Sequence, residues 1–177
     1  MRQEERRART RSALLRAAAA AFAERGYEGA SLDSIAASAA LSKGAVYAHF
    51  PTKLFLYLGV VDQLLDQAEF RLDKVAAAVT AGANPGHAAA VYMGLAGDDE
   101  HAALMAELCQ VAVSEADVRA ALESYRDRRQ ALLGHAGVDS GLTPAQALEQ
   151  AQVIGKLVDA EILYRRISEA GRIHAGT

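Results

Sequence analysis

The chain of 177 residues is long enough for one or two small domains with a buried core. About half of its residues are apolar, yet no apolar run approaches the roughly 20 residues that a membrane span needs. The Arg-rich N-terminus is not followed by the apolar segment of a secretory signal. The single cysteine, Cys109, excludes an intramolecular disulfide and fits a reducing compartment, so we expect a cytoplasmic protein.

Charge is divided unevenly along the chain. Residues 1–54 contain 9 Lys and Arg against 5 Asp and Glu, a balance of +4, whereas residues 55–177 contain 10 against 17, a balance of −7; together these give the overall −3. A basic N-terminal part on an acidic protein is expected when only that end meets phosphate groups. The distribution therefore favours nucleic-acid binding by the N-terminal residues.

Helices dominate the predicted secondary structure, because alanine is abundant and no segment alternates apolar and polar residues as a strand does. Residues 1–9 are a charged arm that we expect to fray without DNA, where it either contacts the DNA or stays solvated. Residues 10–25 are predicted to form the first helix, which Gly26 ends with a positive φ. The apolar stripe of this helix is Leu14, Leu15, Ala18, Ala21 and Phe22.

Residues 31–53 are predicted to contain two short helices joined by a tight turn at residues 40–41. Ser31 is a suitable N-cap for the first helix, and Ser42 can cap the second, which runs to about Phe50. This is helix-turn-helix geometry, whose second helix is sized to enter a DNA major groove. The side chains predicted to point inward are Val46 and Phe50. The residues predicted to face outward are Ser42, Lys43, Gly44, Ala45, Tyr47 and His49.

A long helix is predicted next, over residues 53–79, with Thr52 as its cap. Its apolar positions follow one another at spacings of four and three: Leu54, Leu58, Val61, Leu65, Ala68, Leu72, Val75 and Val79. Residues 80–86 form the clearest linker, since Asn84-Pro85-Gly86 is a strong turn signal. Beyond it we expect helices at residues 87–95, 100–113 and 118–133 and from 144 onward, a loop at 134–141, and disorder after residue 171.

From residue 10 to about residue 58 the chain resembles the TetR family of bacterial transcriptional regulators. The ordered residues that carry this resemblance are Thr10-Arg11, Ala17-Ala18, Phe22, Gly26-Tyr27, Ser31, Ile35-Ala36, Ala39, Leu41-Ser42-Lys43-Gly44, Tyr47, His49-Phe50 and Lys53. Two positions depart from the family pattern. Ala40 stands where the turn usually carries Gly, at a cost of roughly 1 kcal/mol if its φ is positive. Leu54 stands where an acidic residue commonly follows the Lys.

The resemblance implies an all-α fold, with a three-helix helix-turn-helix domain at residues 1–52. Residues 53–177 would form a C-terminal helical bundle for dimerisation and effector binding. The implied function is transcription regulation in the bacterial cytoplasm, at the nucleoid. A homodimeric repressor would bind an inverted-repeat operator in double-stranded DNA and be released by a small hydrophobic effector. Such a protein is not an enzyme and needs no cofactor or metal.

Sequence chemistry assigns DNA contacts within this segment. Lys43 can donate to guanine, and Ala45 offers a methyl-sized contact to thymine. Tyr47 suits either a base or a phosphate, and the alternative for His49 is packing at the helix end. The remaining candidates suit phosphates: Arg11, Ser31, Ser42, the backbone of Gly44, and Lys53.

A dimer interface is predicted on the last long helix together with the helix at residues 118–133. Small residues spaced four apart would let a second helix approach closely, and the family resemblance implies a four-helix bundle. The alternative is that these small residues pack within one chain against the helix at residues 53–79. The predicted interface residues are Leu122, Tyr125, Ala147, Ala151, Ile154, Gly155, Val158 and Ile162.

An effector pocket is predicted among apolar and sulfur-containing side chains, which make an adaptable wall. These residues are Leu58, Val61, Leu65, Tyr92, Met93, Met105, Leu108, Cys109 and Tyr125. The alternative is that they simply fill the core. A further alternative for the whole C-terminal bundle is that it docks a protein partner and binds no small molecule.

No sequence motif indicates enzymatic chemistry. The chain has no Gly-rich phosphate loop, no HExxH and no cysteine pair for a metal. The histidines His87, His101, His135 and His174 lie beside turns or polar residues and are predicted to be on the surface. Cys109 is predicted to be a buried, inert thiol, since no basic residue lies within one helical turn of it.

Overall fold

The computed structural model describes residues 2–96 and 99–175, with side chains for residues 3–95 and 101–165. Within this part of the chain all regular secondary structure is α-helical, which confirms the predicted fold class. The helices are α1 (Arg2–Gly29), α2 (Leu32–Ser38), α3 (Lys43–His49), α4 (Lys53–Thr80), α5 (Pro85–Ala96), α6 (Asp99–Ser114), α7 (Ala116–Asp139) and α8 (Pro144–Ala175).

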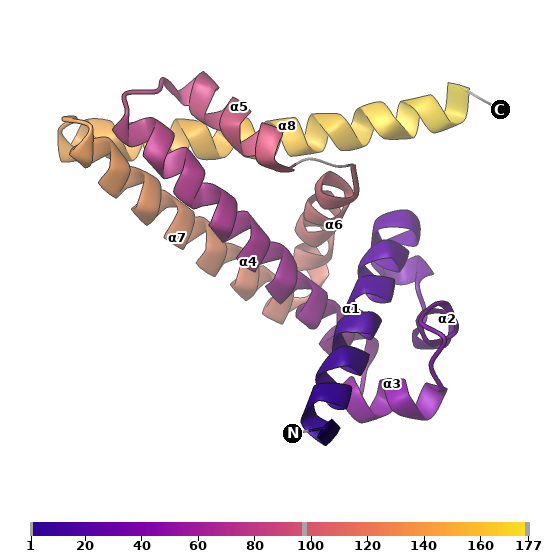
Figure 1. Ribbon diagram of the computed structural model, residues 1–177. Helices are drawn as coiled ribbons and strands as arrows, with labels where there is room; N and C mark the ends of the chain where they lie inside the picture. The colour runs from indigo at the N-terminus through magenta and orange to yellow at the C-terminus, as the bar shows by residue number, and fades with distance from the viewer. Residues whose placement is uncertain (1, 97–98, 176–177) are drawn as a thin grey trace.

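Helices α1 to α3 gather at one end of the molecule, and the remaining helices form a body behind them (Figure 1). Helices α4 and α7 run side by side, and α8 crosses their far end with α5 packed along it. Helix α6 contacts α1, α7 and α8, so it joins the N-terminal helices to the body. Helix α3 lies at the end remote from α8, where it can meet a partner without obstruction from the body.

Helix α1 begins at Arg2, so the expectation that residues 2–9 fray is wrong. Arg, Glu, Gln and Ala all favour helix, and Glu4 and Glu5 in the first turn complement the helix dipole. Gly26 has a positive φ of 72°, as predicted, but α1 continues past this kink to Gly29 instead of ending there. The predicted apolar stripe from Leu14 to Phe22 is buried.

The helix-turn-helix is built by local capping. Ser31 accepts a hydrogen bond from the Ser34 N–H (3.1 Å) and caps α2, and Ser42 accepts one from the Ala45 N–H (3.2 Å) and caps α3. Thr52 caps α4 in the same way. All three caps were predicted, because each depends on a hydroxyl side chain directly before its helix.

Ala40, in the turn between α2 and α3, has a φ of 54°. This left-handed conformation crowds the Cβ of an L-residue, which is why the corresponding turn commonly carries glycine. We expect Ala40→Gly to raise the free energy of unfolding by about 1 kcal/mol, or the melting temperature by about 2–4 °C.

Thermal unfolding followed by circular dichroism measures this gain. Ala37→Gly, in the helical part of α2, is the control and should be destabilising because glycine weakens a helix interior. An equal loss of stability in both variants would contradict the strain at Ala40.

The hydrophobic core is one continuous cluster that runs from α1 through α4 into α8. Helix α4 supplies most of its length, and the predicted stripe is buried at Val61, Leu65, Ala68, Leu72, Val75 and Val79. Leu54 and Leu58 pack against the same cluster while partly exposed. Within the described residues no helix is long and apolar enough to cross a membrane.

Helices α7 and α8 are longer than predicted. Residues 134–139 continue α7 and are not a loop, because Gly137 lies against Ala147 of α8 and this packing outweighs the weak helix preference of glycine. The turn therefore falls at Ser140–Thr143, and Thr143 caps α8 as predicted. Helix α8 continues to Ala175, so the predicted disorder of residues 172–175 is wrong, and residues 176–177 lie outside the described part.

Candidate nucleic-acid interface

Helix α3 presents a short polar and aromatic surface on the outside of the N-terminal helices. Tyr47 is 50% exposed, and Lys43 and Gly44 are also exposed, whereas Val46 and Phe50 are buried, as predicted. A Cβ at Gly44 would meet no atom within 4 Å, so a large group can approach the backbone there. A single binding partner can therefore reach the Tyr47 hydroxyl, the Lys43 ammonium group and the open backbone at Gly44.

Lys43 is paired in the free protein with Asp33 of α2. Its Nζ lies 2.5 Å from the Asp33 carboxylate, and this hydrogen bond raises the pKa of Lys43. Both side chains are exposed, so the pair is weakly held and can exchange for a stronger acceptor. Lys43 therefore keeps its charge and can turn from α2 to a base or phosphate.

Positive charge also reaches the far end of α3 from α1. His49 is half-buried, and burial, together with the fields of Arg7 and Arg11, lowers its pKa. The Arg11 guanidinium lies 5.1 Å from the centre of the Phe50 ring. Arg7 was not among the predicted contacts, because its segment was expected to fray. Its i, i+4 spacing from Arg11 is the signal that places both on one face of a helix.

Ser31, Ser42 and Ala45 lie at or beside the starts of α2 and α3. Both serines are exposed while they cap their helices, and Ala45 is half-buried. Exposed helix N-termini with a hydroxyl group suit phosphate oxygens. Their roles in DNA binding remain predictions.

Lys53 has partners within the chain. Its Nζ donates to the carbonyl oxygen of Tyr27 (2.9 Å), lies 4.4 Å from the centre of the Tyr27 ring, and is 3.9 Å from the Glu28 carboxylate. The peptide N–H of Tyr27 donates to the carboxylate of Glu107, on α6 (2.5 Å). Lys53 therefore ties the start of α4 to the end of α1 as well as being a candidate phosphate contact.

We expect Lys53→Ala to have two separable effects. Loss of the bond to Tyr27 should lower the free energy of unfolding by about 1 kcal/mol. Loss of one phosphate contact should reduce the slope of log affinity against log salt by about one unit per subunit. Binding titrations at several salt concentrations, beside thermal unfolding, measure both effects. Lower stability with an unchanged slope would leave Lys53 with the structural role alone.

Most of the predicted effector-pocket residues lie in the core of the described part of the chain. Val61, Leu65, Tyr92, Met93, Met105, Leu108 and Tyr125 are buried, and Leu58 packs against them. The Tyr92 and Tyr125 hydroxyls lie 3.4 Å apart, and burial raises the pKa of both groups. These side chains pack between α4, α5, α6 and α7, and their part in an effector pocket stays a prediction.

Cys109 and His101 are both placed differently from the prediction. Cys109 is exposed, and an Arg126 nitrogen from α7 approaches its sulfur at 4.0 Å, a neighbour that sequence separation hid. His101 is buried, with a guanidinium nitrogen of Arg71 2.9 Å from its ring nitrogens. The charged neighbours of His101 in the sequence had suggested a surface position, and helix α4 covers it instead.

The residues predicted to form the dimer interface are buried inside one chain, which corrects that prediction. They are Leu122, Tyr125, Ala147, Ala151, Ile154, Gly155, Val158 and Ile162. A Cβ at Gly155 would lie 2.8 Å from Arg129, whose guanidinium is bound to Asp159 at 2.7 Å. The ridge of small residues therefore lets α7 approach α8 within the chain, rather than a second copy or α4.

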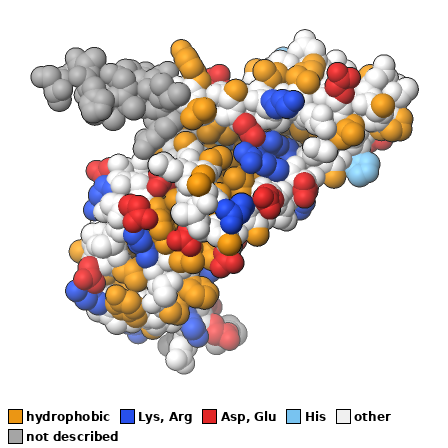
Figure 2. All heavy atoms as spheres, turned by 180° about the vertical axis from the view of Figure 1, so that it is seen from behind, with side chains coloured by type: hydrophobic (Ala, Val, Ile, Leu, Met, Phe, Trp, Pro, Cys, Tyr) orange, Lys and Arg blue, Asp and Glu red, His pale blue; other side chains and the backbone are white. Residues whose placement is uncertain are grey.

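Acidic and basic side chains are interspersed over the face of the molecule shown in Figure 2, with hydrophobic side chains among them. No single sign of charge dominates that face. The N-terminal excess of basic residues therefore forms no broad patch on this face.

Residues 14–60 match the family described as bacterial regulatory proteins, tetR family. A segment of 56 residues is 46% identical to the HTH-type transcriptional activator FasR of Mycolicibacterium smegmatis, and covers 32% of this chain and 26% of that protein. The chain thus matches only about a quarter of the length of this relative.

Two solved structures share the fold over most of the chain. A transcriptional regulator from Rhodococcus sp. RHA1 is 25% identical, with a TM-score of 0.75 over 90% of this chain and 85% of that one. Bacillus subtilis FadR, solved in complex with stearoyl-CoA, is 20% identical, with a TM-score of 0.65 over 90% and 88%. The family concerned is one of transcriptional regulators and not of enzymes. With its capped helix-turn-helix, the N-terminal segment at residues 14–60 matches the TetR family of bacterial regulatory proteins, and the all-α body shares the fold of solved regulators.

Proposed function

We propose that the protein regulates transcription by binding an inverted-repeat operator in double-stranded DNA as a homodimer. The observation that carries this is helix α3, which is capped by Ser42, anchored by buried Val46 and Phe50, and turned outward at Lys43 and Tyr47. One such helix reads only a few base pairs, so a specific site needs two heads about one DNA turn, or a multiple of it, apart.

In this proposal residues 1–52 read the DNA and residues 53–177 provide dimerisation and sensing. The protein acts in the bacterial cytoplasm, at the nucleoid. A small hydrophobic effector releases it from the operator, so that it works as a repressor. Support for the effector is indirect: the FadR structure that shares this fold contains stearoyl-CoA. An effector shifts the DNA-binding equilibrium only through its different affinity for the two conformations.

Contacts between α6 and the end of α1 offer a route for this release. The Glu107 carboxylate of α6 accepts the Tyr27 N–H just after the break at Gly26. A ligand that moves α6 relative to α4 would change where this carboxylate holds α1. The heads of the two subunits would then no longer match the spacing of the operator.

Selection of random duplex DNA by the purified protein, followed by sequencing, tests the proposal. We expect an enriched inverted repeat with half-sites separated by about one helical turn or a multiple. A reporter gene behind the selected operator then distinguishes repression from the activation for which the FasR relative is named. Absence of enrichment at low salt would reject operator binding.

The dimer requires a surface other than the buried ridge, and the outer side of α7 and α8 supplies one. A shallow groove there is lined by Ala131, Gly134 and Val138 of α7 and by Leu148 of α8. Val138 and Leu148 are both exposed, at 44% and 45%, and the small residues allow close approach of a second copy. We place the two-fold interface on this side.

Val138→Lys should therefore weaken the dimer, because each copy would bring an ammonium group into the apolar interface. We expect the dimer dissociation constant to rise about 100-fold. Sedimentation velocity over a dilution series measures it. Val113→Lys on α6, where the side chain is 79% exposed, is the matched control and should leave the dimer intact. Equal behaviour of the two variants would move the interface elsewhere.

A further inference from the structure

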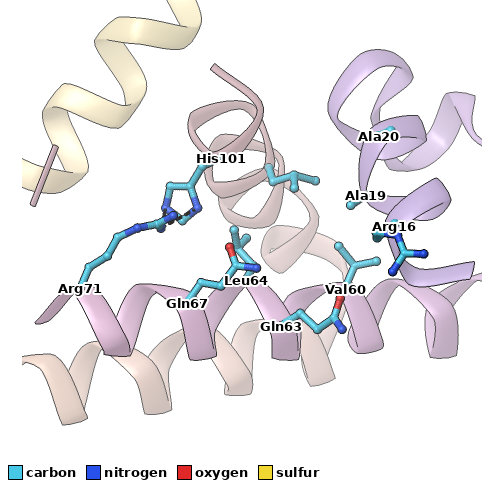
Figure 3. Close-up of a pocket in the computed structure, with 10 residues that line it drawn as sticks. Arg16, Ala19, Ala20, Val60, Gln63, Leu64, Gln67, Arg71 and His101 are labelled. Atoms are coloured by element: carbon cyan, nitrogen blue, oxygen red, sulfur yellow. Dashed lines mark hydrogen bonds between the residues drawn. The ribbon is translucent and has the colours of Figure 1, made fainter. Parts of the chain in front are cut away.

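A groove of about 390 Å³ lies between α1, α4 and α6. Val60, Leu64 and Leu104 form an apolar floor, since all three are buried. Ala19 and Ala20 of α1 close one end, and Arg71 and His101 lie at the other (Figure 3). Gln63 and Gln67 stand on the rim, where their amides can hydrogen-bond to an occupant.

The side chain of Arg71 indicates that the groove binds an anion. This side chain is half-buried: Nε donates to the Leu95 carbonyl (3.1 Å), and Nη1 lies 2.9 Å from the His101 ring nitrogens. Among the described residues Arg71 forms no ion pair, whereas Arg129, also buried, is neutralised by Asp159. A partly buried guanidinium is normally matched by an anion.

The other charged lining residue is Arg16, and none of the ten lining residues is acidic. The contacts with Leu95 and His101 hold the Arg71 guanidinium in place without a carboxylate beside it, so it is preorganised for an oxyanion. Val60 and Arg71 lie eleven positions apart on α4, which corresponds to about 16 Å of helix. This length suits an extended hydrocarbon chain that lies on Val60, Leu64 and Leu104 between polar side chains at the rim.

We infer that this groove binds an amphiphile with an anionic head, a carboxylate or a phosphate, at Arg71. Its apolar body lies along Val60, Leu64 and Leu104 and ends against Ala19 and Ala20. Helix α1 packs with the helix-turn-helix, whereas α4 and α6 belong to the body. A ligand in this groove therefore contacts both the N-terminal helices and the body. The claim that this ligand is the effector rests on the proposed function. The claim that the groove binds it does not.

Isothermal titration with decanoate, decyl phosphate and decanol tests the head group. We expect decanoate or decyl phosphate to bind at least about tenfold more tightly than decanol, and the stronger of the two identifies the head. Shortening the chain should weaken binding about fourfold for each buried methylene. Equal affinity for decanol, or no binding of either anion at millimolar concentration, would overturn the inference.

Variants locate the head. Arg71→Gln should weaken the preferred anion about tenfold, and Arg16→Gln, at an exposed position, should weaken it less. Arg165→Gln is the matched control, because Arg165 lines a separate groove between α5 and α8. Thermal unfolding of each free variant checks that Arg71→Gln still folds. An unchanged affinity in both Arg71→Gln and Arg16→Gln would exclude this groove.

A fluorescent reporter locates the apolar body. The chain has no tryptophan, so Gln63→Trp adds a single reporter at the rim, and Leu157→Trp adds one in the groove between α5 and α8. Saturating ligand should shift the emission of Gln63→Trp alone. A response only at Leu157→Trp would overturn the placement. The affinity of the ligand-free protein for the selected operator is measured separately. A failure of DNA binding can then be distinguished from a failure of ligand binding in the groove.

Discussion

Tyr47→Ala is expected to lower affinity for the selected operator about 100-fold while leaving the fold intact. Tyr47 is half-exposed on α3, so its removal opens no cavity in the core. A dimer loses the contact twice, and each side-chain contact to a base or phosphate contributes about 1–2 kcal/mol, which together give two powers of ten.

Electrophoretic mobility shift or fluorescence anisotropy on the selected operator measures this loss. Tyr164→Ala is the matched control, since Tyr164 is 65% exposed but lies on α8. Circular dichroism should show equal helicity and melting temperature for both variants. If Tyr47→Ala binds the operator as tightly as Tyr164→Ala does, Tyr47 is not part of the interface.

Gly155→Leu is expected to destabilise the subunit itself. The new Cβ would lie 2.8 Å from Nη2 of Arg129, whose side chain is 7% exposed and bound through both terminal nitrogens to Asp159. Displacing a mostly buried ion pair should lower the free energy of unfolding by about 3 kcal/mol, or the melting temperature by about 6–12 °C.

Gly94→Leu is the matched control, because a Cβ at this exposed glycine of α5 meets no atom within 4 Å. Its stability should change by less than about 0.5 kcal/mol. In an Arg129→Ala background, Gly155→Leu should cost clearly less, since the clashing guanidinium is gone. If the Gly155→Leu protein melts at the same temperature as Gly94→Leu but sediments as a monomer, the dimer interface includes the ridge of Ala147, Ala151 and Gly155.

The sequence predicts the N-terminal helices well because their boundaries depend on local chemistry. Ser31, Ser42 and Thr52 each cap the helix that follows, and Gly26 supplies a positive φ, so a few adjacent residues determine each boundary. The strain at Ala40 was predictable for the same reason. The resemblance to a known family added the expectation that α3 faces DNA.

Long-range packing limits the prediction of the body. The spacing of Ala147, Ala151 and Gly155 indicates that another helix approaches closely, but it does not identify that helix. In the structure the approaching helix is α7 of the same chain. From the sequence, Gly137 is predicted to lie in a loop, whereas in the structure it is helical and packs against Ala147. The burial of His101 beside Arg71 joins residues thirty positions apart, which no local pattern reveals.

The backbone of Tyr27 is held at both its N–H and its carbonyl oxygen by oppositely charged side chains. Glu107 binds its N–H from α6, and Lys53 binds its carbonyl oxygen from α4. If one of these helices slid past the other, the two hydrogen bonds would pull on opposite ends of residue 27. A small translation in the body would become a rotation of α1, and the reach of two side chains would set where the DNA-reading helix points.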